Sequence, residues 1–518
     1  MIFLHKPPLF DCFYLRKVLY HISVILTMLF GFKKHNRAAA GKQMDMLHGP
    51  MFKNVLLFAL PLALAGILQQ LFTSADMAVI FWFEGSVAQS AVNSNGALVN
   101  LIINLFTGLS VGATVVIAEL VGKSSTDDLH SVVFTSFIIA LVSGVILVGL
   151  GIGVSAPLLK IMDTPPEALP LAIEYLRIYF IGMPALMVYN FGAAILRSVG
   201  DTRKPLFILV VTGIVNVGCN ILFVAAFKMS VAGVATATVI ANYLSAAIVI
   251  VFIMKDESLK VKRGAKFRKE YLIRICVIGL PAGLQGVVFS IANVFIQTSI
   301  NGFGAQAVAG SGDAVNFESY VYFFVNAFAQ TTVTFFGQNY AAGEFDRCRR
   351  AFKINMLSGL VVSTVLSVVF VAGGRLFIRI YTTDEVAIEY AVMRLWCVCI
   401  GSMIPCLYEI AGGALRGMGH SLLPAVFTIV GSCVLRLIWI YTVFAAYPLY
   451  WVLLVVYPLS WTITGGAMLI AYFVIFRKAV KKNIPPKSDD GEVGEQTIEQ
   501  AKKFLLCKTF RVFEIYAA

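Results

Sequence analysis

The chain contains a succession of long apolar segments, and this feature limits its fold more than any other. A helix that crosses the hydrocarbon core of a bilayer needs about 20 mostly apolar residues. Of the 518 residues, 59% are hydrophobic and only 13% are charged, whereas soluble domains average about 45–50% and about 25%. We therefore expect an all-α integral membrane protein. The apolar segments predict twelve transmembrane helices, at about 54–82, 91–120, 130–150, 170–195, 205–227, 231–254, 271–300, 305–340, 354–373, 387–413, 421–446 and 451–476.

Lysine and arginine are distributed unevenly among the connections between these segments. The connections after odd-numbered segments hold four of them, whereas those after even-numbered segments, with the stretch past the last segment, hold twenty. Because positive charge accumulates in cytoplasmic loops, we expect an even number of spans and both termini in the cytoplasm. Such loops can face anionic lipid headgroups, which accounts for the net charge of +13 without a nucleic-acid partner.

Two short motifs occur twice at almost the same distance. The pair Leu60-Pro61 returns as Leu280-Pro281, 220 positions later. Four residues of a charged turn return 219 positions later: Leu196, Arg197, Gly200 and Pro205 as Leu415, Arg416, Gly419 and Pro424. Six spans separate the copies, so the two halves have the same orientation in the membrane. Parallel repeats of this kind are typical of transporters.

The repeat and the charge pattern together predict the domain organisation. Two six-helix lobes are joined by a basic cytoplasmic linker and followed by a cytoplasmic tail; the boundaries are 46–254, 255–270, 271–478 and 479–518. Residues 1–45 are predicted to be an N-terminal extension, because the apolar run at 18–32 is shorter than a span. We expect the true start of the protein at Met44 or Met46 and not at Met1.

Ionisable residues inside apolar segments are candidates for function, because burying a charge in the membrane is costly. The strongest candidate is Asp76, a carboxyl that could take up a proton on one side of the membrane and release it on rehydration. It could equally ligate sodium, or serve only as a structural carboxyl bonded to a neighbouring helix. Asn216 and Asn220 are four residues apart and so lie on one helical face. They could bond around Asp76 or act as plain interhelical contacts.

The second half offers a different polar set. Glu409 stands 219 positions after Asn190, and polar residues at both repeat positions indicate either a shared structural role or a site. Arg436 could neutralise Glu409, in an ion pair that is more often architectural than mechanistic.

Catalytic and metal chemistry find little support in the sequence. All six histidines lie in the ends or loops, and the nine cysteines form no paired motif. We therefore expect no metal site, no cofactor and no enzymatic activity. A membrane acyl or glycosyl transferase would need a catalytic histidine or an acidic pair at an interface.

Four stretches of the sequence resemble the MATE (multidrug and toxic compound extrusion) family, in its bacterial branches. They are LPLALAGILQQLFTSAD in the first segment, ILRSVGDTRKPL, FGQNYAAGEFDRCRRAF and ALRGMGHSLLPA. The resemblance covers about 46–478 and implies a V-shaped pair of six-helix lobes. It also implies export of cationic, amphiphilic or aromatic compounds, driven by inward flow of protons or sodium.

The resemblance assigns roles residue by residue. Asp76 matches the family's aspartate of helix 1, its usual cation site. Asn216 and Asn220 match an Asn-x-x-x-Asp pair whose second member is here an asparagine, which leaves Asp76 as the only buried acid of that site. The usual acid of helix 10 is here Pro405, and Glu409, one turn away on the same face, is a candidate substitute. Glu119 stands where the family commonly has glutamine.

The sequence thus predicts a secondary active multidrug exporter, an antiporter coupled to H⁺ or Na⁺. We expect a monomer in the plasma membrane whose partners are membrane lipid, the coupling ion, and cationic or aromatic small molecules. The alternative is a flippase or exporter of lipid-linked precursors from the same superfamily. The scarcity of Lys and Arg within the spans of the first half counts against a site for a pyrophosphate there.

Overall fold

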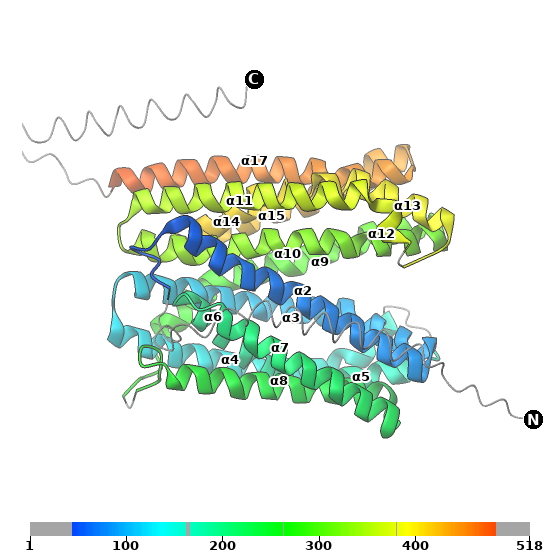
Figure 1. Ribbon diagram of the computed structural model, residues 1–518, viewed down its shortest axis with the longest axis horizontal. Coiled ribbons are helices and arrows are strands. Elements are labelled where there is room, and N and C mark those ends of the chain that lie inside the picture. Colours follow the sequence, from blue (N-terminus) through cyan, green and yellow to red (C-terminus); the bar gives the residue numbers. More distant parts are fainter. Residues whose placement is uncertain (1–43, 162–165, 263, 380, 483–518) are drawn as a thin grey trace, which may run out of the picture. The chain divides into compact units, whose positions relative to one another are not determined.

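The computed structural model describes residues 44–161, 166–262, 264–379 and 381–482, which fold into helices joined by short turns (Figure 1). The predicted extension up to residue 43 and the predicted tail from residue 483 lie outside the described residues. The first half contains α2 (Met51–Glu84), α3 (Ser86–Gly122), α4 (Thr126–Ile161), α5 (Leu169–Ile181), α6 (Met183–Ser198), α7 (Arg203–Asn220), the π-helix η1 (Ile221–Ala226) and α8 (Ser230–Lys255).

The second half repeats this series with more interruptions. It contains α9 (Lys269–Asn301), α10 (Ala305–Ala341), α11 (Phe345–Ala372), α12 (Gly374–Ile378), α13 (Glu385–Cys397), the 3₁₀-helix η2 (Cys399–Gly401), α14 (Pro405–Gly417), α15 (Leu422–Thr428), the π-helix η3 (Ile429–Val434), α16 (Leu435–Trp439), the π-helix η4 (Ile440–Phe444) and α17 (Tyr450–Lys482).

Each of the twelve predicted spans coincides with a helix or with a run of consecutive helices. Within the described residues, nine helices are long and apolar enough to cross a bilayer, and two bent pairs raise the number to as many as eleven. In the first pair, α5 and α6 meet at a bend of 50°. In the second, the segment formed by α13 and η2 meets α14 at a bend of 43°. The remaining predicted span, 305–340, is α10, which is not among these candidates. Its polar residues, Asp313 and Glu318 among them, lower its hydropathy.

The repeated charged turn has the same geometry in both halves. Gly200 and Gly419 adopt φ angles of 95° and 86°, in the left-handed region that glycine enters without strain. The amide of Asp201 donates to the carbonyl of Leu196 at 2.9 Å, and that of His420 donates to the carbonyl of Leu415 at 2.9 Å. These bonds close the helix ends in the manner of a Schellman motif, which explains why the leucine and the glycine recur together.

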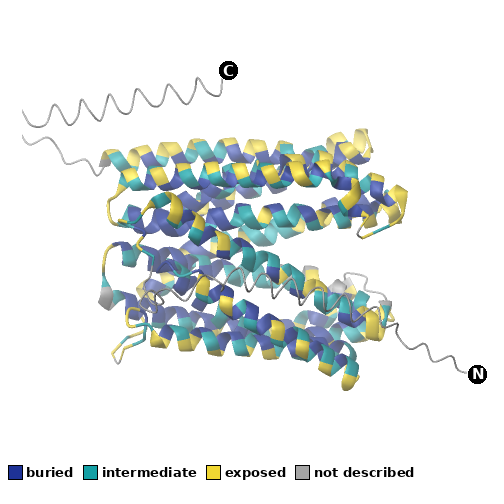
Figure 2. Ribbon diagram, in the orientation of Figure 1, coloured by how far each residue is buried: buried dark blue, intermediate teal, exposed yellow. Residues whose placement is uncertain are grey.

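Buried residues fill the sides of the helices that face one another (Figure 2). Most of the hydrophobic ones form two large clusters, and helices α2 and α9 each contribute to both. The first cluster consists mainly of residues from α3 to α8, and the second mainly of residues from α10 to α17. The early part of α2, with Phe58 and Ala63, lies in the second cluster, whereas Val79 and Ile80 lie in the first. Helix α2 therefore packs in the second cluster near its start and in the first cluster near its end.

Helix α9 makes the reverse exchange. Tyr271, Ile275 and Ile278 lie in the first cluster, whereas Ile296 and Ile300 lie in the second. In both helices the change of partner falls after a proline inside the helix, Pro61 in α2 and Pro281 in α9. A proline removes one intrahelical hydrogen bond and bends a helix. In α9, Pro281 stands between the parts that pack in different clusters, whereas in α2, Pro61 lies within the part that packs in the second cluster.

Helices α3 and α9 lie unusually close together. A Cβ placed on Gly283 would come within 2.2 Å of the carbonyl oxygen of Leu105, and one placed on Gly112 within 2.3 Å of the carbonyl oxygen of Ile275. Small residues allow this approach, as they do between membrane helices in general.

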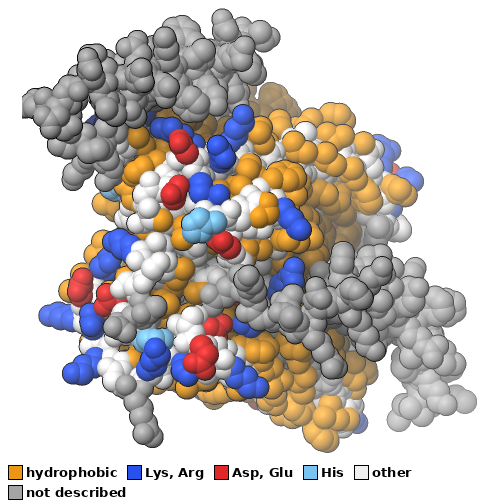
Figure 3. Space-filling view, turned by 60° about the vertical axis from the view of Figure 1, so that its left-hand side comes forward, with side chains coloured by type: hydrophobic (Ala, Val, Ile, Leu, Met, Phe, Trp, Pro, Cys, Tyr) orange, Lys and Arg blue, Asp and Glu red, His pale blue; other side chains and the backbone are white. Residues whose placement is uncertain are grey.

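One end of the bundle carries most of the charged side chains, and we call it the basic end (Figure 3). It holds the turns at 123–125, 199–202, 256–268, 342–344 and 418–421. Contacts between the sequence halves gather here. Arg274 forms an ion pair with Glu119, Arg268 pairs with Asp128 at 2.8 Å, and Gln338 Nε2 donates to the carbonyl of Ser198 at 2.6 Å.

Candidate functional site

Asp76 lies on α2 and contacts Asn220, one of the two asparagines that share a face of α7. Asn220 Nδ2 donates to Asp76 Oδ1 at 2.5 Å and lies 3.4 Å from Asn216 Oδ1. Asn216 Nδ2 in turn lies 3.4 Å from the hydroxyl of Thr238 on α8. Three helices of the first half are thus joined through Asp76, Asn220, Asn216 and Thr238, a set that we call the Asp76 network.

The two asparagines of the Asp76 network are buried, Asp76 and Thr238 are half-buried, and one acceptor has no donor in the described part of the chain. Asn220 is fully buried and Asn216 is 6% exposed. Asn220 Oδ1 has no hydrogen-bond partner among the described residues, and no ion pair to Asp76 is found within them. An uncompensated carboxylate beside an unpaired amide oxygen is an arrangement that a proton or a metal cation such as sodium would satisfy.

The backbone changes its winding directly after Asn220. Helix α7 ends at this residue and the π-helix η1 follows, and π-helical turns are frequent at functional sites. Two tyrosines of α5, Tyr175 and Tyr179, stack at 5.8 Å between ring centroids and lie close enough to Asp76 for an electrostatic interaction. Their rings give the site an aromatic side.

Glu409 lies on α14 in the second half and has different neighbours. The hydroxyl of Tyr322, on α10, donates to Glu409 Oε1 at 3.5 Å. Arg416 lies about two turns further along α14, and its Nη2 donates to Gln285 Oε1 on α9 at 2.8 Å. Asn190, its counterpart on α6, is half-buried, and no hydrogen bond joins it to Glu409 or Arg436 in the described residues.

Arg436 does not pair with Glu409, contrary to the expectation from the sequence. Its Nε donates to Ser460 Oγ at 3.2 Å and its Nη1 to Asn293 Oδ1 at 3.3 Å. The side chain is completely buried. Because α16 directs it toward α9 and α17, it meets neutral oxygen atoms and aromatic rings, and among the described residues no ion pair includes it.

The sequence analysis missed an ion pair that the structure forms between α10 and α13. Arg394 donates from Nε and Nη2 to the two carboxylate oxygens of Glu318 at 2.8 and 3.0 Å, and from Nη1 to Ser311 Oγ at 3.0 Å. Glu318 was visible in the sequence as an acid inside the predicted span 305–340. Arg394 is only 4% exposed. Because its charge is balanced by Glu318, we interpret the pair as a structural one.

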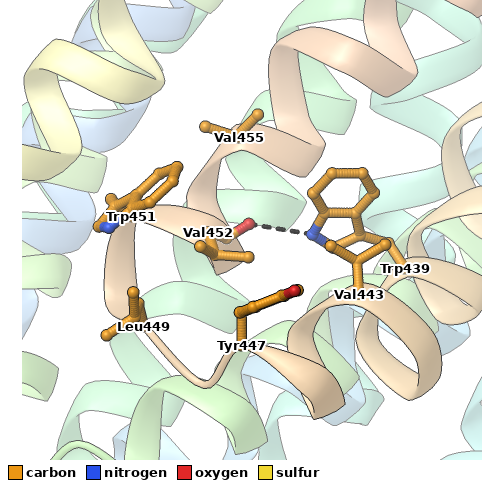
Figure 4. A pocket seen from close by; sticks show the side chains of 7 residues that line it. All are labelled: Trp439, Val443, Tyr447, Leu449, Trp451, Val452 and Val455. Carbon is orange, nitrogen blue, oxygen red and sulfur yellow. Dashed lines mark hydrogen bonds between the residues drawn. The ribbon is translucent and has the colours of Figure 1, made fainter.

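An apolar pocket of about 330 Å³ opens at the end of the bundle away from the basic end (Figure 4). None of the predicted site residues lines it. Trp439 Nε1 donates to the carbonyl of Val452 at 2.9 Å across its wall. Its lining comes from α16, η4, α17 and the turn between them: Trp439, Val443, Tyr447, Leu449, Trp451, Val452 and Val455.

The family model named MatE matches the chain twice, at residues 61–222 and 281–442. The two matches begin at the repeated prolines and lie 220 positions apart, so each half of the chain is one copy of the family's unit. The chain belongs to the MatE family. The predicted MATE resemblance and the internal repeat are thereby confirmed, and the protein is a multi-pass membrane transporter and not an enzyme.

Several MATE proteins are similar to the chain over most of its length. It is 25% identical over 391 residues to the probable multidrug resistance protein YoeA of Bacillus subtilis, covering 73% of this chain and 84% of that protein. It is 22% identical over 437 residues to the multidrug export protein MepA of Staphylococcus aureus, covering 83% and 96%.

Solved structures show the same fold. A crystal structure of a MATE protein in complex with MaL6 superposes with a TM-score of 0.80 at 20% identity, covering 85% of this chain and 99% of that one. An outward-facing multidrug resistance MATE transporter of the MOP superfamily gives a TM-score of 0.78 at 20% identity, covering 85% and 100%. The predicted all-helical membrane fold is confirmed.

Proposed function

We propose that this transporter exports cationic or amphiphilic aromatic small molecules from the cell, by antiport against H⁺ or Na⁺. The observation that carries the proposal is the Asp76 network, in which a half-buried carboxyl within the apolar helix α2 has an amide partner and, among the described residues, no basic one. Relatives that bear the names multidrug resistance protein and multidrug export protein support the drug-like class of substrate.

The proposed cycle begins with a cation, most simply a proton, that binds Asp76 from the outer side. Binding changes the contact between Asp76 and Asn220, and α2 rearranges near Pro61, within its part that packs in the second cluster. The substrate then loses affinity and leaves. A cation can drive such a change only if its affinity differs between the two states, and a hydrogen bond that one state makes and the other breaks supplies that difference.

The proposal also includes the orientation of the protein in the membrane and the membrane in which it lies. With the basic end in the cytoplasm, both termini of the described chain lie there, and the ion pairs of that end close the transporter toward the cytoplasm. Its setting is the plasma membrane, and a single chain provides both halves of the machinery, which is consistent with a monomer.

The deciding experiment is dye export in proteoliposomes under an imposed proton gradient or an imposed sodium gradient. The wild type is compared with Asp76→Asn, and Glu84→Gln serves as the control because Glu84 is an exposed acid at the end of the same helix. Proton-driven transport that Asp76→Asn abolishes and Glu84→Gln preserves supports the proposal.

Other outcomes point elsewhere. Transport driven by sodium alone that survives Asp76→Asn would move the cation site toward Glu409 and overturn the assigned role of Asp76. No dye movement under either gradient would favour the alternative, a flippase or exporter of lipid-linked or other amphiphilic precursors.

A further inference from the structure

We propose that the second half of the transporter binds a monovalent anion, chloride or a carboxylate, at Arg436 and Trp461. The site goes beyond the proposed cation coupling. It lies between α16, α17 and α9 and shares no residue with the Asp76 network.

The guanidinium of Arg436 is buried and carries a charge that nothing nearby balances. Its hydrogen-bond partners, Ser460 and Asn293, are neutral, and its Nη2 has no partner in the described part of the chain. Removing one partner from a buried charge pair is strongly destabilising, and an unpaired buried charge is correspondingly costly. An anionic partner would remove that cost.

A second donor without a partner accompanies Arg436. Trp461 Nε1 is buried and has no acceptor among the described residues, and the Trp461 ring centroid lies 6.0 Å from the Arg436 guanidinium carbon. Arginine and the indole of tryptophan donate hydrogen bonds and accept none. Two such groups side by side require an acceptor, and the positive charge selects a negatively charged one.

Aromatic rings hold the guanidinium in place for this task. Its carbon lies 4.5 Å from the ring centroid of Tyr457 and 5.2 Å from that of Phe289. Cation–π contacts of this kind stabilise a cation that is removed from water, yet they leave the N–H edge available. The rings therefore explain how Arg436 can be buried without a carboxylate while its Nη2 remains a donor.

The neighbouring charges do not cancel that of Arg436. Arg394 lies 5.3 Å from the same Tyr457 ring, but both oxygens of Glu318 are occupied by Arg394. Two guanidinium groups and one carboxylate leave one positive charge in this part of the second half, which matches a single negative charge on the ligand.

The helix that carries Arg436 is irregular on both sides of this residue, and we infer that entry of an anion depends on this irregularity. The side chain is completely enclosed, and it stands on the short helix α16 between the π-helices η3 and η4. Insertions into the α-helical winding of this kind are often found at functional sites. A change of winding on either side of α16 would turn Arg436 and open its Nη2 to an ion.

The first arm of the test measures anion binding by the purified protein and does not rest on the proposed export function. Thermal unfolding is followed while sodium chloride or sodium acetate replaces sodium isethionate at constant ionic strength. Trp461→Phe keeps an aromatic ring near Arg436 and removes the N–H together with part of the indole, a loss of size that the control below shares. Trp439→Phe is the matched control, because the N–H of Trp439 already donates to Val452.

For a free anion, the unfolding temperature of the wild type rises with chloride or acetate and then saturates. We expect Trp461→Phe to weaken the apparent anion affinity about tenfold, the usual effect of losing one hydrogen bond to a charged group. Trp439→Phe leaves that affinity unchanged. Arg436→Lys, which keeps the charge but loses the planar fork, weakens it as well if it folds; Trp461→Phe decides the matter if it does not.

The second arm asks whether the carboxylate belongs to a transported compound, and it rests on the proposed function. Two rhodamines with the same cationic ring system are compared in proteoliposomes, one with a free carboxyl and one with an ethyl ester. A substrate carboxylate predicts that Trp461→Phe lowers transport of the free acid about tenfold relative to the ester, with no saturable chloride effect. A free anion predicts that both dyes respond alike.

Equal anion responses of the wild type and Trp461→Phe, together with equal handling of both dyes, would overturn the proposal. If the wild type transports neither dye, the export function fails and the chloride titration alone decides the anion site. A saturable response that Trp461→Phe weakens then supports the site, and the lack of one refutes it.

Discussion

Asn220 is the side chain on which the proposed cation site depends most, because it contacts both Asp76 and Asn216. Its replacement by alanine removes the hydrogen bond to the carboxylate. A hydrogen bond to a charged group is worth about 1.5–3 kcal/mol, and roughly 1.4 kcal/mol corresponds to a factor of ten.

We therefore expect Asn220→Ala to slow gradient-driven dye transport at least about tenfold, while dye binding measured by fluorescence polarisation changes little. Asn216→Ala serves as the comparison, since its bond to Thr238 is long, at 3.4 Å, and its effect should be smaller. Equal losses in both variants would mean that the asparagines act only as helix contacts.

Residue-level reasoning from the sequence succeeded where spacing alone determines proximity. Two asparagines four apart on one helix must share a face, and the structure brings that face to Asp76. The same reasoning failed for Arg436, because its direction depends on the π-helices beside it. A change of winding rotates the residues that follow, and no residue type in the sequence marks it.

At the level of the helices, the predicted spans agree with the observed ones to within a few residues at most ends. The longest difference is the third span, predicted at 130–150 and observed at Thr126–Ile161. The length of an apolar segment shows where a helix crosses the membrane, but it does not show where that helix is broken or bent. The bends between α5 and α6 and between α13 and α14 depend on packing that hydropathy does not record.

A substitution in the repeated turn tests how much the left-handed backbone conformation of its glycine contributes to stability, because an added side-chain atom there would meet no neighbour. Gly419 adopts a left-handed φ, and a Cβ added to it would meet nothing within 4 Å. Gly419→Ala should therefore cost only the conformational penalty, about 1–2 kcal/mol, and lower the unfolding temperature in detergent. Gly466→Ala is the control, for which we expect the stability to change in the opposite direction. Gly466 lies inside α17 with equally open space, so alanine should stabilise by about 0.5–1 kcal/mol.

The contact of α3 with α9 offers a second test at this scale. A Cβ on Gly283 would come within 2.2 Å of the carbonyl oxygen of Leu105, so Gly283→Ala must push the helices apart. Overpacking of this kind typically costs about 1–3 kcal/mol. We expect a lower unfolding temperature and faster amide exchange along both helices. An unchanged exchange rate in α3 would show that the contact is not tight in solution.

For the whole molecule, the ion pair between Glu119 and Arg274 joins the two sequence halves at the basic end. Glu119→Gln removes the charge and keeps the shape, so we expect closure to weaken by about 1 kcal/mol or less, as for a partly exposed pair. Hydrogen exchange at the basic ends of α3 and α9 should speed up by a few-fold. Glu257→Gln, in the exposed linker, should leave it unchanged.

The arrangement of the halves was only partly visible in the sequence. The repeat and the charge alternation predicted two like-oriented halves, and the two family matches confirm the repeat. The predicted lobe boundaries remain a prediction, and the interior does not simply follow them, because α2 and α9 each join both clusters. Hydropathy could not show this, since an apolar face looks the same whichever half it contacts.

The divided packing of α2 has a consequence for how the protein is made. A ribosome delivers α2 to the membrane before the other described helices, but Phe58 packs edge-on against Phe335 of α10 in the second cluster. The early part of α2 must therefore stay in contact with lipid until Phe335, 277 positions after Phe58, has been synthesised. The packing of the first lobe cannot be completed before the second lobe has been synthesised. We therefore expect the last step of folding to be the docking of α2 and α9 against both halves at once.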